Sequence, residues 1–215
     1  MTFGYVRALA VLRRTFARSG VRKRAYVLGR LLTCPFLSVV NALPKGARVL
    51  DIGAGHGTFA RLAAESGAAL VVALEPDLRK SLPSFRHPGV AFVAGFDEAL
   101  AGSFDAVTVI DVLYKVPLDQ WDALFGRIRE RLAPGGILLL KELDPEHRWK
   151  NAWNRAQEHA ANALDLTLGR SFSYENRRQL EARLARLGFV DFRARAIGRW
   201  YPHAHVLYSA RRPVL

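Results

Sequence analysis

Short apolar runs alternate with stretches of helical periodicity from residue 47 to about residue 140. Each run is four to seven residues long and is bounded by turn-forming or polar residues, as expected of a buried strand. The expected strands are residues 47–52, 69–74, 90–94, 104–110 and 137–140, and the expected helices are residues 58–66 and 118–132. Continuous apolar strands that alternate with helices form a parallel sheet covered on both faces, so the pattern predicts an open α/β fold. Ligands of such folds bind at the carboxyl ends of the strands.

The pattern changes beyond residue 140. Helical periodicity is expected over residues 146–168 and 173–187, with Ser173 as the cap of the second helix and Gly188 as its terminator. The two remaining strands are expected at residues 192–197 and 205–210. The predicted sheet therefore has seven strands.

The first 45 residues are predicted to be a basic helical segment, and residues 46–215 the main domain, with a helical lid at about 146–170. Wound as a helix, the N-terminal segment has one apolar and one basic face. The apolar face holds Tyr5, Leu9, Leu12 and Phe16, and the basic face holds Arg7, Arg14 and Arg18. Two interpretations follow: the helix packs on its own domain, or it contacts an anionic membrane or RNA.

Charge is distributed unevenly along the 215 residues, whose net charge is +13. Residues 1–50 carry +10 with no acid, residues 51–147 carry −5, and residues 148–215 carry +8. A protein that coats nucleic acid would be basic throughout. The distribution instead indicates a catalytic or ligand-binding centre with basic surroundings that could attract an anionic partner.

Composition excludes several classes of protein. With 50% hydrophobic and 24% charged residues, the chain can bury an ordinary core. The single cysteine, Cys34, rules out a disulfide framework and a zinc site built on several thiolates. No apolar run approaches the roughly 18 residues of a membrane span. The pair Arg13-Arg14 lacks the long apolar stretch of an export signal, so we expect a cytoplasmic protein, with a mitochondrial presequence as the alternative.

The most informative motif lies at residues 49–58, Val-Leu-Asp-Ile-Gly-Ala-Gly-His-Gly-Thr. Its glycines fall where a strand turns into a helix, and glycine allows both a tight turn and the close approach of a ligand to the backbone. Thr58 takes the place of the third glycine in the dinucleotide fingerprint, which argues against a nicotinamide dehydrogenase. Asp51, two residues before the first glycine, could face a ligand cation.

This Asp-x-Gly-x-Gly-x-Gly motif resembles motif I of class I S-adenosylmethionine-dependent methyltransferases. Further segments that resemble the family are Glu75, 24 residues after Asp51, and residues 95–97, 104–116, 132–136 and 205–212. The resemblance implies the fold class, an open, doubly wound and mostly parallel seven-stranded sheet with an antiparallel last strand and helices on both faces. It also implies S-adenosyl-L-methionine as the cofactor.

The resemblance assigns the cofactor site residue by residue. Glu75 would accept hydrogen bonds from both ribose hydroxyls, and the segment that ends at Asp97 would contact the adenine. The full expected set is Asp51, Gly53, Ala54, Gly55, Gly57, Glu75, Pro76, Phe96, Asp97 and Asp111. For each of these acids, a helix cap or a surface position is the alternative role.

Candidates for catalysis are less specific. Asp111 ends the fourth strand, and His147, His203 and His205 are expected near the same sheet edge, where an imidazole could act as a general base. Packing or surface roles remain open for each histidine. The pair His203-x-His205 has no evident third ligand, so we expect no metal site.

The acceptor can be narrowed by exclusion. The segment Ile110-Asp111-Val112-Leu113 differs from the Asn/Asp-Pro-Pro-Tyr/Phe motif of enzymes that methylate exocyclic amines of bases, and no Pro-Cys nucleophile is present there. The lid, rich in tryptophan and alanine, favours an aromatic or lipophilic acceptor. We therefore predict methyl transfer to a small or lipid-linked acceptor, at oxygen or carbon rather than nitrogen, with peripheral membrane contact through the basic N-terminus. The alternatives are an RNA methyltransferase and a non-catalytic membrane-surface module.

Overall fold

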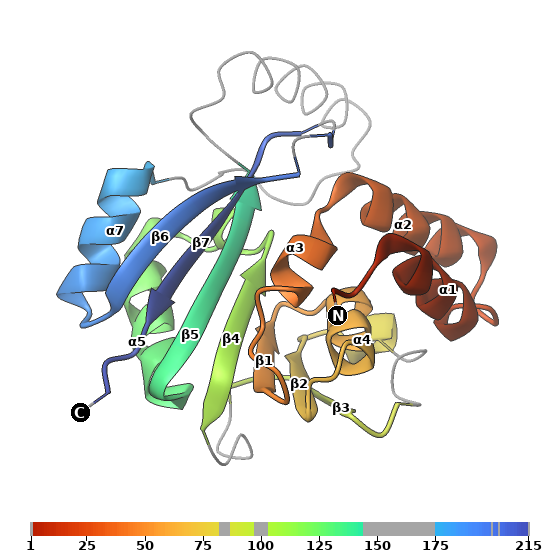
Figure 1. Ribbon diagram of the computed structural model, residues 1–215, viewed down its shortest axis with the longest axis horizontal. Coiled ribbons are helices and arrows are strands. Elements are labelled where there is room, and N and C mark those ends of the chain that lie inside the picture. The colour runs from red at the N-terminus through yellow and green to blue at the C-terminus, as the bar shows by residue number, and fades with distance from the viewer. Residues whose placement is uncertain are drawn as a thin grey trace.

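The computed structural model describes residues 2–81, 87–96, 103–143, 175–198, 200–201 and 203–214. Its centre is a seven-stranded sheet in the order β3-β2-β1-β4-β5-β7-β6 (Figure 1). The strands are β1 (Arg48–Ile52), β2 (Leu70–Leu74), β3 (Val90–Val93), β4 (Phe104–Ile110), β5 (Leu132–Leu143), β6 (Val190–Ile197) and β7 (His205–Arg211). Pairs among β1 to β5 are parallel, whereas β7 is antiparallel to both of its neighbours. The predicted fold class is confirmed.

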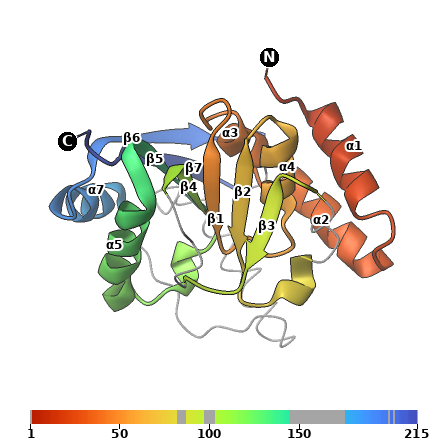
Figure 2. The ribbon, with the colours of Figure 1, turned by 90° about the horizontal axis from the view of Figure 1, so that it is seen from below.

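Helices cover both faces of the sheet. The helices are α1 (Tyr5–Thr15), α2 (Val21–Thr33), α3 (Phe36–Val40), α4 (Thr58–Glu65), α5 (Trp121–Arg131) and α7 (Arg177–Arg186), with short 3-10 turns at Leu113–Lys115 and Leu118–Gln120. Successive strand residues point to opposite faces, so Val49 packs with α1–α4 while Leu50 packs with α5 and α7. Figure 2 shows these two groups of helices apart, α1–α4 beside β1–β3 and α5 with α7 beyond β5.

Most predicted bounds lie within two residues of the observed ones, and three elements differ more. Strand β5 was expected only at residues 137–140 but also includes residues 132–136 and 141–143; the N–H of Gly135 donates to the carbonyl of Arg212 at 2.9 Å and keeps its first part in the sheet. The helix expected from residue 118 starts with a 3-10 turn and becomes α-helical only at Trp121. Helix α7 begins at Arg177 and is capped by Asn176, which exchanges hydrogen bonds with Gln179 in a capping box; the expected start at Ser173 was wrong, and Ser173 itself lies outside the described residues. Gly188 follows the end of α7 with a φ of 80°, as expected of a terminator.

The N-terminal segment packs on the domain. Leu12 and Phe16 of the predicted apolar face are buried. On the other face, Arg7 donates to the backbone carbonyl of Glu65 at 2.9 Å and Arg14 lies 3.5 Å from the Glu65 carboxylate. The apolar face of α1 therefore packs on its own domain, which is the first of the two interpretations given above. No helix in the described ranges is long and apolar enough to cross a membrane. The predicted lid at 146–170 lies outside the described residues.

Candidate active site

The loop between β1 and α4 turns around three glycines. Gly53, Gly55 and Gly57 have φ values of 72°, 56° and 72°, a region that strains residues with a side chain. Gly53 also approaches the segment after β4, since a Cβ there would lie 2.4 Å from Cγ2 of Val112. The N–H of Gly53 donates to the carbonyl of Leu74 at 2.9 Å, which ties the loop to the end of β2. Only a glycine-rich sequence can take this path.

Glu75 directly follows β2, beside this loop, and is almost fully buried. Its Oε2 accepts a hydrogen bond from the N–H of Gly55 at 2.9 Å. Its Oε1 accepts from the N–H of Asp77 and from Nζ of Lys80, both at 3.1 Å. The carboxylate is thus fixed in orientation on the loop side, while its Oε1 is held in part by Lys80, whose side chain is 46% exposed and can move.

Asp51 of β1 is a second buried acid near the glycine loop, with 2% of its surface exposed. Its Oδ1 accepts a hydrogen bond from Oγ1 of Thr108 at 2.9 Å, and its Oδ2 has no partner among the described residues. Burial raises the pKa of Asp51 to about 7; the Thr108 hydrogen bond opposes this shift and the negative charge of Glu75 adds to it. A buried carboxylate oxygen without a partner is costly unless a donor or a cation reaches it.

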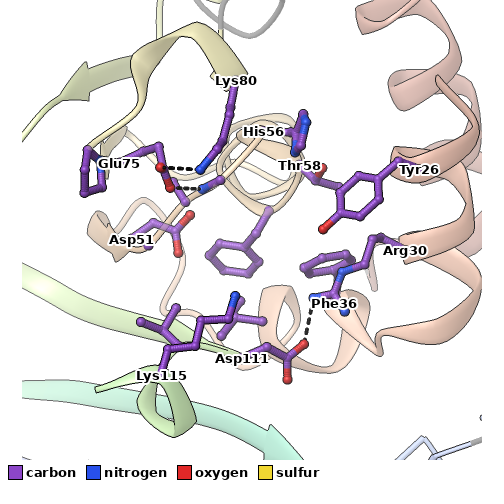
Figure 3. A pocket seen from close by; sticks show the side chains of 17 residues that line it. Tyr26, Arg30, Phe36, Asp51, His56, Thr58, Glu75, Lys80, Asp111 and Lys115 are labelled. Carbon is purple, nitrogen blue, oxygen red and sulfur yellow. Dashed lines mark hydrogen bonds and ion pairs between the residues drawn. The ribbon is translucent and has the colours of Figure 1, made fainter. Parts of the chain in front are cut away.

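A cavity of about 390 Å³ lies along these groups, at the carboxyl ends of β1, β2 and β4 (Figure 3). Of the predicted cofactor residues, its lining includes Asp51, Gly53, Ala54, Gly55, Glu75, Pro76 and Asp111. Gly57 is instead the N-cap residue of α4. Phe96 is not among the lining residues and packs under Arg127, whose guanidinium lies 5.5 Å from its ring centre. Asp97 lies outside the described residues.

Two residues of α2 close the cavity opposite the strands, and the sequence analysis missed them. Tyr26 and Arg30 are one helical turn apart and therefore lie on one side of α2, and Figure 3 shows both directed at the cavity. Tyr26 also packs against His56 of the glycine loop, with ring centres 4.9 Å apart. The i, i+4 spacing of an aromatic and a cation was visible in the sequence, but nothing in it showed which element that side of α2 would face.

Asp111 stands at the far end of the cavity, between two cations. Its Oδ2 accepts from Arg30 at 2.7 Å and its Oδ1 from Lys141 at 2.5 Å. Burial alone would raise the pKa of Asp111, but the two cations outweigh it and lower that pKa to about 2. Asp111 also has a φ of 55°, which is unusual for a residue with a side chain. The side chain of Lys141 is fully buried, so this ion pair is shielded from water.

Two further groups border this cluster. Glu142 accepts hydrogen bonds at Oε1 from the N–H groups of Val112 and Leu113, at 3.1 and 2.9 Å, and so fixes the turn after β4. Burial, together with the charge of Asp111, raises the pKa of Glu142 to about 8. His205 is nearly fully buried and its Nε2 lies 2.9 Å from the carbonyl of Thr33. Burial, and then the charge of Lys141, lowers the pKa of His205 to about 3, so its imidazole is neutral.

The remaining predicted catalytic residues are placed only in part. His203 is half-buried, with its ring centre 6.3 Å from that of His205. His147 lies outside the described residues. As expected for the connection between the last two strands, β7 begins beside the carboxyl end of β5, where His205 pairs with Leu143.

Comparison with known proteins decides the family. A family model described as a methyltransferase domain matches residues 22–193, which is most of the chain. The chain belongs to this methyltransferase domain family. Family and fold together confirm the predicted class, the class I methyltransferases with a Rossmann-like fold, whose cofactor is S-adenosyl-L-methionine.

Individual relatives are more distant. The methyltransferase is 38% identical over 112 residues to a ubiquinone biosynthesis O-methyltransferase of Xanthomonas axonopodis pv. citri, covering 47% of this chain and 45% of that protein. It is 29% identical over 106 residues to a demethylspheroidene O-methyltransferase of Rhodobacter capsulatus, covering 44% and 25%. The chain thus matches less than half the length of these curated relatives.

A solved structure shows the same fold over nearly the whole chain. It is the 1,6-didemethyltoxoflavin-N1-methyltransferase of Burkholderia thailandensis, with bound 1,6-didemethyltoxoflavin and S-adenosylhomocysteine. The TM-score is 0.65 at 20% identity, with 98% of this chain and 91% of that chain covered. At this identity the likeness concerns the fold alone.

Proposed function

We propose that this methyltransferase transfers the methyl group of S-adenosyl-L-methionine to a hydroxyl group of a small aromatic or lipophilic acceptor. The observation that carries the proposal is the unpartnered, buried Oδ2 of Asp51 beside Glu75 in a cavity bordered by glycines. That arrangement suits a ligand with hydroxyl donors and positive charge. Transfer to oxygen is supported by the names of the two curated relatives, both O-methyltransferases.

Glu75, Asp51 and the glycine loop, at one end of the cavity, fit the cofactor. Glu75 would receive the ribose hydroxyls once Lys80 leaves its Oε1, because the other contacts to this carboxylate come from backbone N–H groups that fix it. Asp51 would face the positively charged part of the ligand. The glycine loop lets the ligand lie against the main chain. When bound, the cofactor supplies an electrophilic methyl group.

The end of the cavity at Asp111 fits an acceptor. Asp111 is kept ionised by Arg30 and Lys141, so it can accept a hydrogen bond from an acceptor hydroxyl and orient that oxygen. With a pKa of about 2, Asp111 does not remove a proton at neutral pH. Of His203 and His205, the first is the better candidate base, because His205 is nearly fully buried. Transfer forms a bond between acceptor oxygen and methyl carbon as the carbon–sulfur bond breaks, and the hydroxyl proton passes to the base.

Calorimetry with S-adenosyl-L-methionine, followed by a labelled-methyl assay on catechol and an alkylated catechol, tests the proposal. We expect cofactor binding and label in the O-methylated product. Failure to bind the cofactor would refute the proposed methyl transfer and favour a non-catalytic module. Cofactor binding with label transferred to RNA, and not to either catechol, would replace the proposed acceptor class by RNA.

A further inference from the structure

Exposed large apolar side chains gather on the first two helices. Among the described residues, nine large apolar side chains are exposed, and five of them lie between residues 5 and 32. The most exposed of these five are Val6 at 84%, Val21 at 78% and Leu32 at 62%. Single exposed apolar residues need no explanation, but several along one side of a single helix mark a contact site.

On α2 these residues form a stripe. Val21, Ala25, Leu28 and Leu32 follow the spacing i, i+4, i+7 and i+11, which places them along one side of the helix. Ala25 is exposed and Leu28 half-buried, so the stripe as a whole faces outward. The buried core residues of α2 are Val27 and Leu31, which lie on a different side of the helix; within the stripe, Leu28 also packs against the edge of the core, so its exposed members are Val21, Ala25 and Leu32.

Three arginines near the stripe form no ion pair with the described residues. Arg18, Arg22 and Arg24 are exposed, and none of the three forms an ion pair within the described part of the chain. No acid occurs anywhere in residues 1–50. By contrast, Arg7 and Arg14 of α1 are used in contacts with Glu65. Among the described residues, the arginines next to the stripe are therefore not used by the fold.

We propose that this face of α2, the stripe with its arginine rim, docks on an anionic phospholipid surface. An apolar stripe that enters the headgroup region, with guanidinium groups beside it that meet lipid phosphates, is the arrangement found in interfacial helices. Nucleic acid would use the arginines but would gain little from Val21 and Leu32, so lipid explains both observations. The proposal stands on the surface alone and does not depend on the acceptor.

The position of α2 makes the contact useful to the reaction. Tyr26 and Arg30 of this helix line the cavity, and the stripe lies on another side of the same helix. A docked bilayer would therefore stand about one helix diameter, ~10 Å, from the cavity. If the proposed function holds, a lipophilic acceptor would have a short path from bilayer to cavity.

Flotation with vesicles tests the proposal. The full chain is mixed with vesicles of phosphatidylcholine alone, or of phosphatidylcholine with about one third phosphatidylglycerol. We expect binding to the anionic vesicles that weakens as salt is raised, because screening shortens the reach of the arginines. The variant Arg18→Gln/Arg22→Gln/Arg24→Gln should bind at least ~20-fold more weakly, and Val21→Ser/Leu32→Ser at least ~5-fold more weakly.

Matched controls come from the other side of the molecule. Val190 and Val214 are exposed apolar residues, and Arg193 and Arg195 are exposed arginines on β6. The variants Val190→Ser/Val214→Ser and Arg193→Gln/Arg195→Gln should bind vesicles as the unaltered protein does. Thermal unfolding and cofactor calorimetry on every variant separate loss of the surface from loss of the fold, and failure of this proposal from failure of the proposed function.

Four results would overturn the proposal. They are no binding to anionic vesicles, equal binding to both vesicle types, equal losses in the control variants, and loss with the arginine variant but not with the Val21/Leu32 variant. If anionic vesicles are not bound while RNA is, and the arginine variant loses RNA, the partner of this face is a nucleic acid and not a lipid.

Discussion

Two carboxylates at strand ends, Asp51 and Asp111, line the same cavity and have opposite surroundings. Asp51 has one hydroxyl donor, no cation within hydrogen-bond distance and another acid nearby, and its pKa rises to about 7. Asp111 lies between Arg30 and Lys141, and its pKa falls to about 2. Both are buried, so burial alone does not decide the charge of either group. Asp51 suits a cationic ligand, because the cation at its end of the cavity, the partly exposed Lys80, contacts Glu75 instead; Asp111 already has two cations and is a fixed anion.

The largest effect is expected at Asp111. Asp111→Asn should lower the free energy of unfolding by about 3–5 kcal/mol, because it leaves the buried ammonium of Lys141 without a counter-charge. Asparagine keeps the shape and tolerates a positive φ, so the change isolates the charge. Urea denaturation measures it. Asp111→Asn/Lys141→Met should recover most of the loss, and a loss below about 1 kcal/mol in the single variant would contradict the assigned ion pair.

Gly53 lies between the Asp51 end and the Asp111 end of the cavity, because it packs closely against Val112, the residue after Asp111. Gly53→Ala should lower the free energy of unfolding by about 2–3 kcal/mol, since the new Cβ would meet Cγ2 of Val112 at 2.4 Å and the φ of 72° is strained. The matched control is Gly55→Ala, which has a φ of 56° and open space, and should cost only about 1–2 kcal/mol. Equal losses in chemical denaturation would show that the close approach to Val112 does not matter.

Glu75 lies at the Asp51 end of the cavity, where we propose that the cofactor binds. Glu75→Ala should weaken binding of S-adenosyl-L-methionine by about 1–3 kcal/mol through the lost ribose hydrogen bonds. Calorimetry measures the change, and Glu130→Ala, at an exposed position of α5, is the control. Unchanged affinity in Glu75→Ala would refute the role given to this carboxylate.

Asp51 should make cofactor affinity depend on pH. Because its pKa is raised to about 7, ionisation on going from pH 6 to pH 8 should tighten binding of a cationic ligand, by at most about tenfold. Stability responds in the opposite direction: the folded state holds a proton that the unfolded state has released, so this contribution is present below about pH 4 and is lost as the pH rises through 7. Calorimetry across this range measures the affinity. The same slope in Asp51→Asn would show that another group titrates.

The sequence predicted the parts of the molecule that local patterns decide. The strand Phe104–Ile110 was placed at its observed bounds because a short, mostly apolar and β-branched segment between polar residues is typical of a buried strand. The glycine loop and Glu75 were found because their spacing follows from a strand-turn-helix unit. The contact of Arg30 with Asp111 was missed because the two residues are 81 positions apart and α2 gives no local signal of what it faces. Asn176 was missed as a cap because Ser173 offered an equally good local signal.

The place of β7 in the sheet has a consequence for the order of folding. As the chain is synthesised, β5 and β6 both precede β7, the strand that lies between them. Until residues 205–211 have been made, neither β5 nor β6 has its partner on that side, and β6 has no neighbour in the sheet. The growing chain therefore carries unpaired strand edges, which are prone to pair with other chains. A delay in making this one strand would expose the protein to aggregation more than a delay anywhere in β1 to β4.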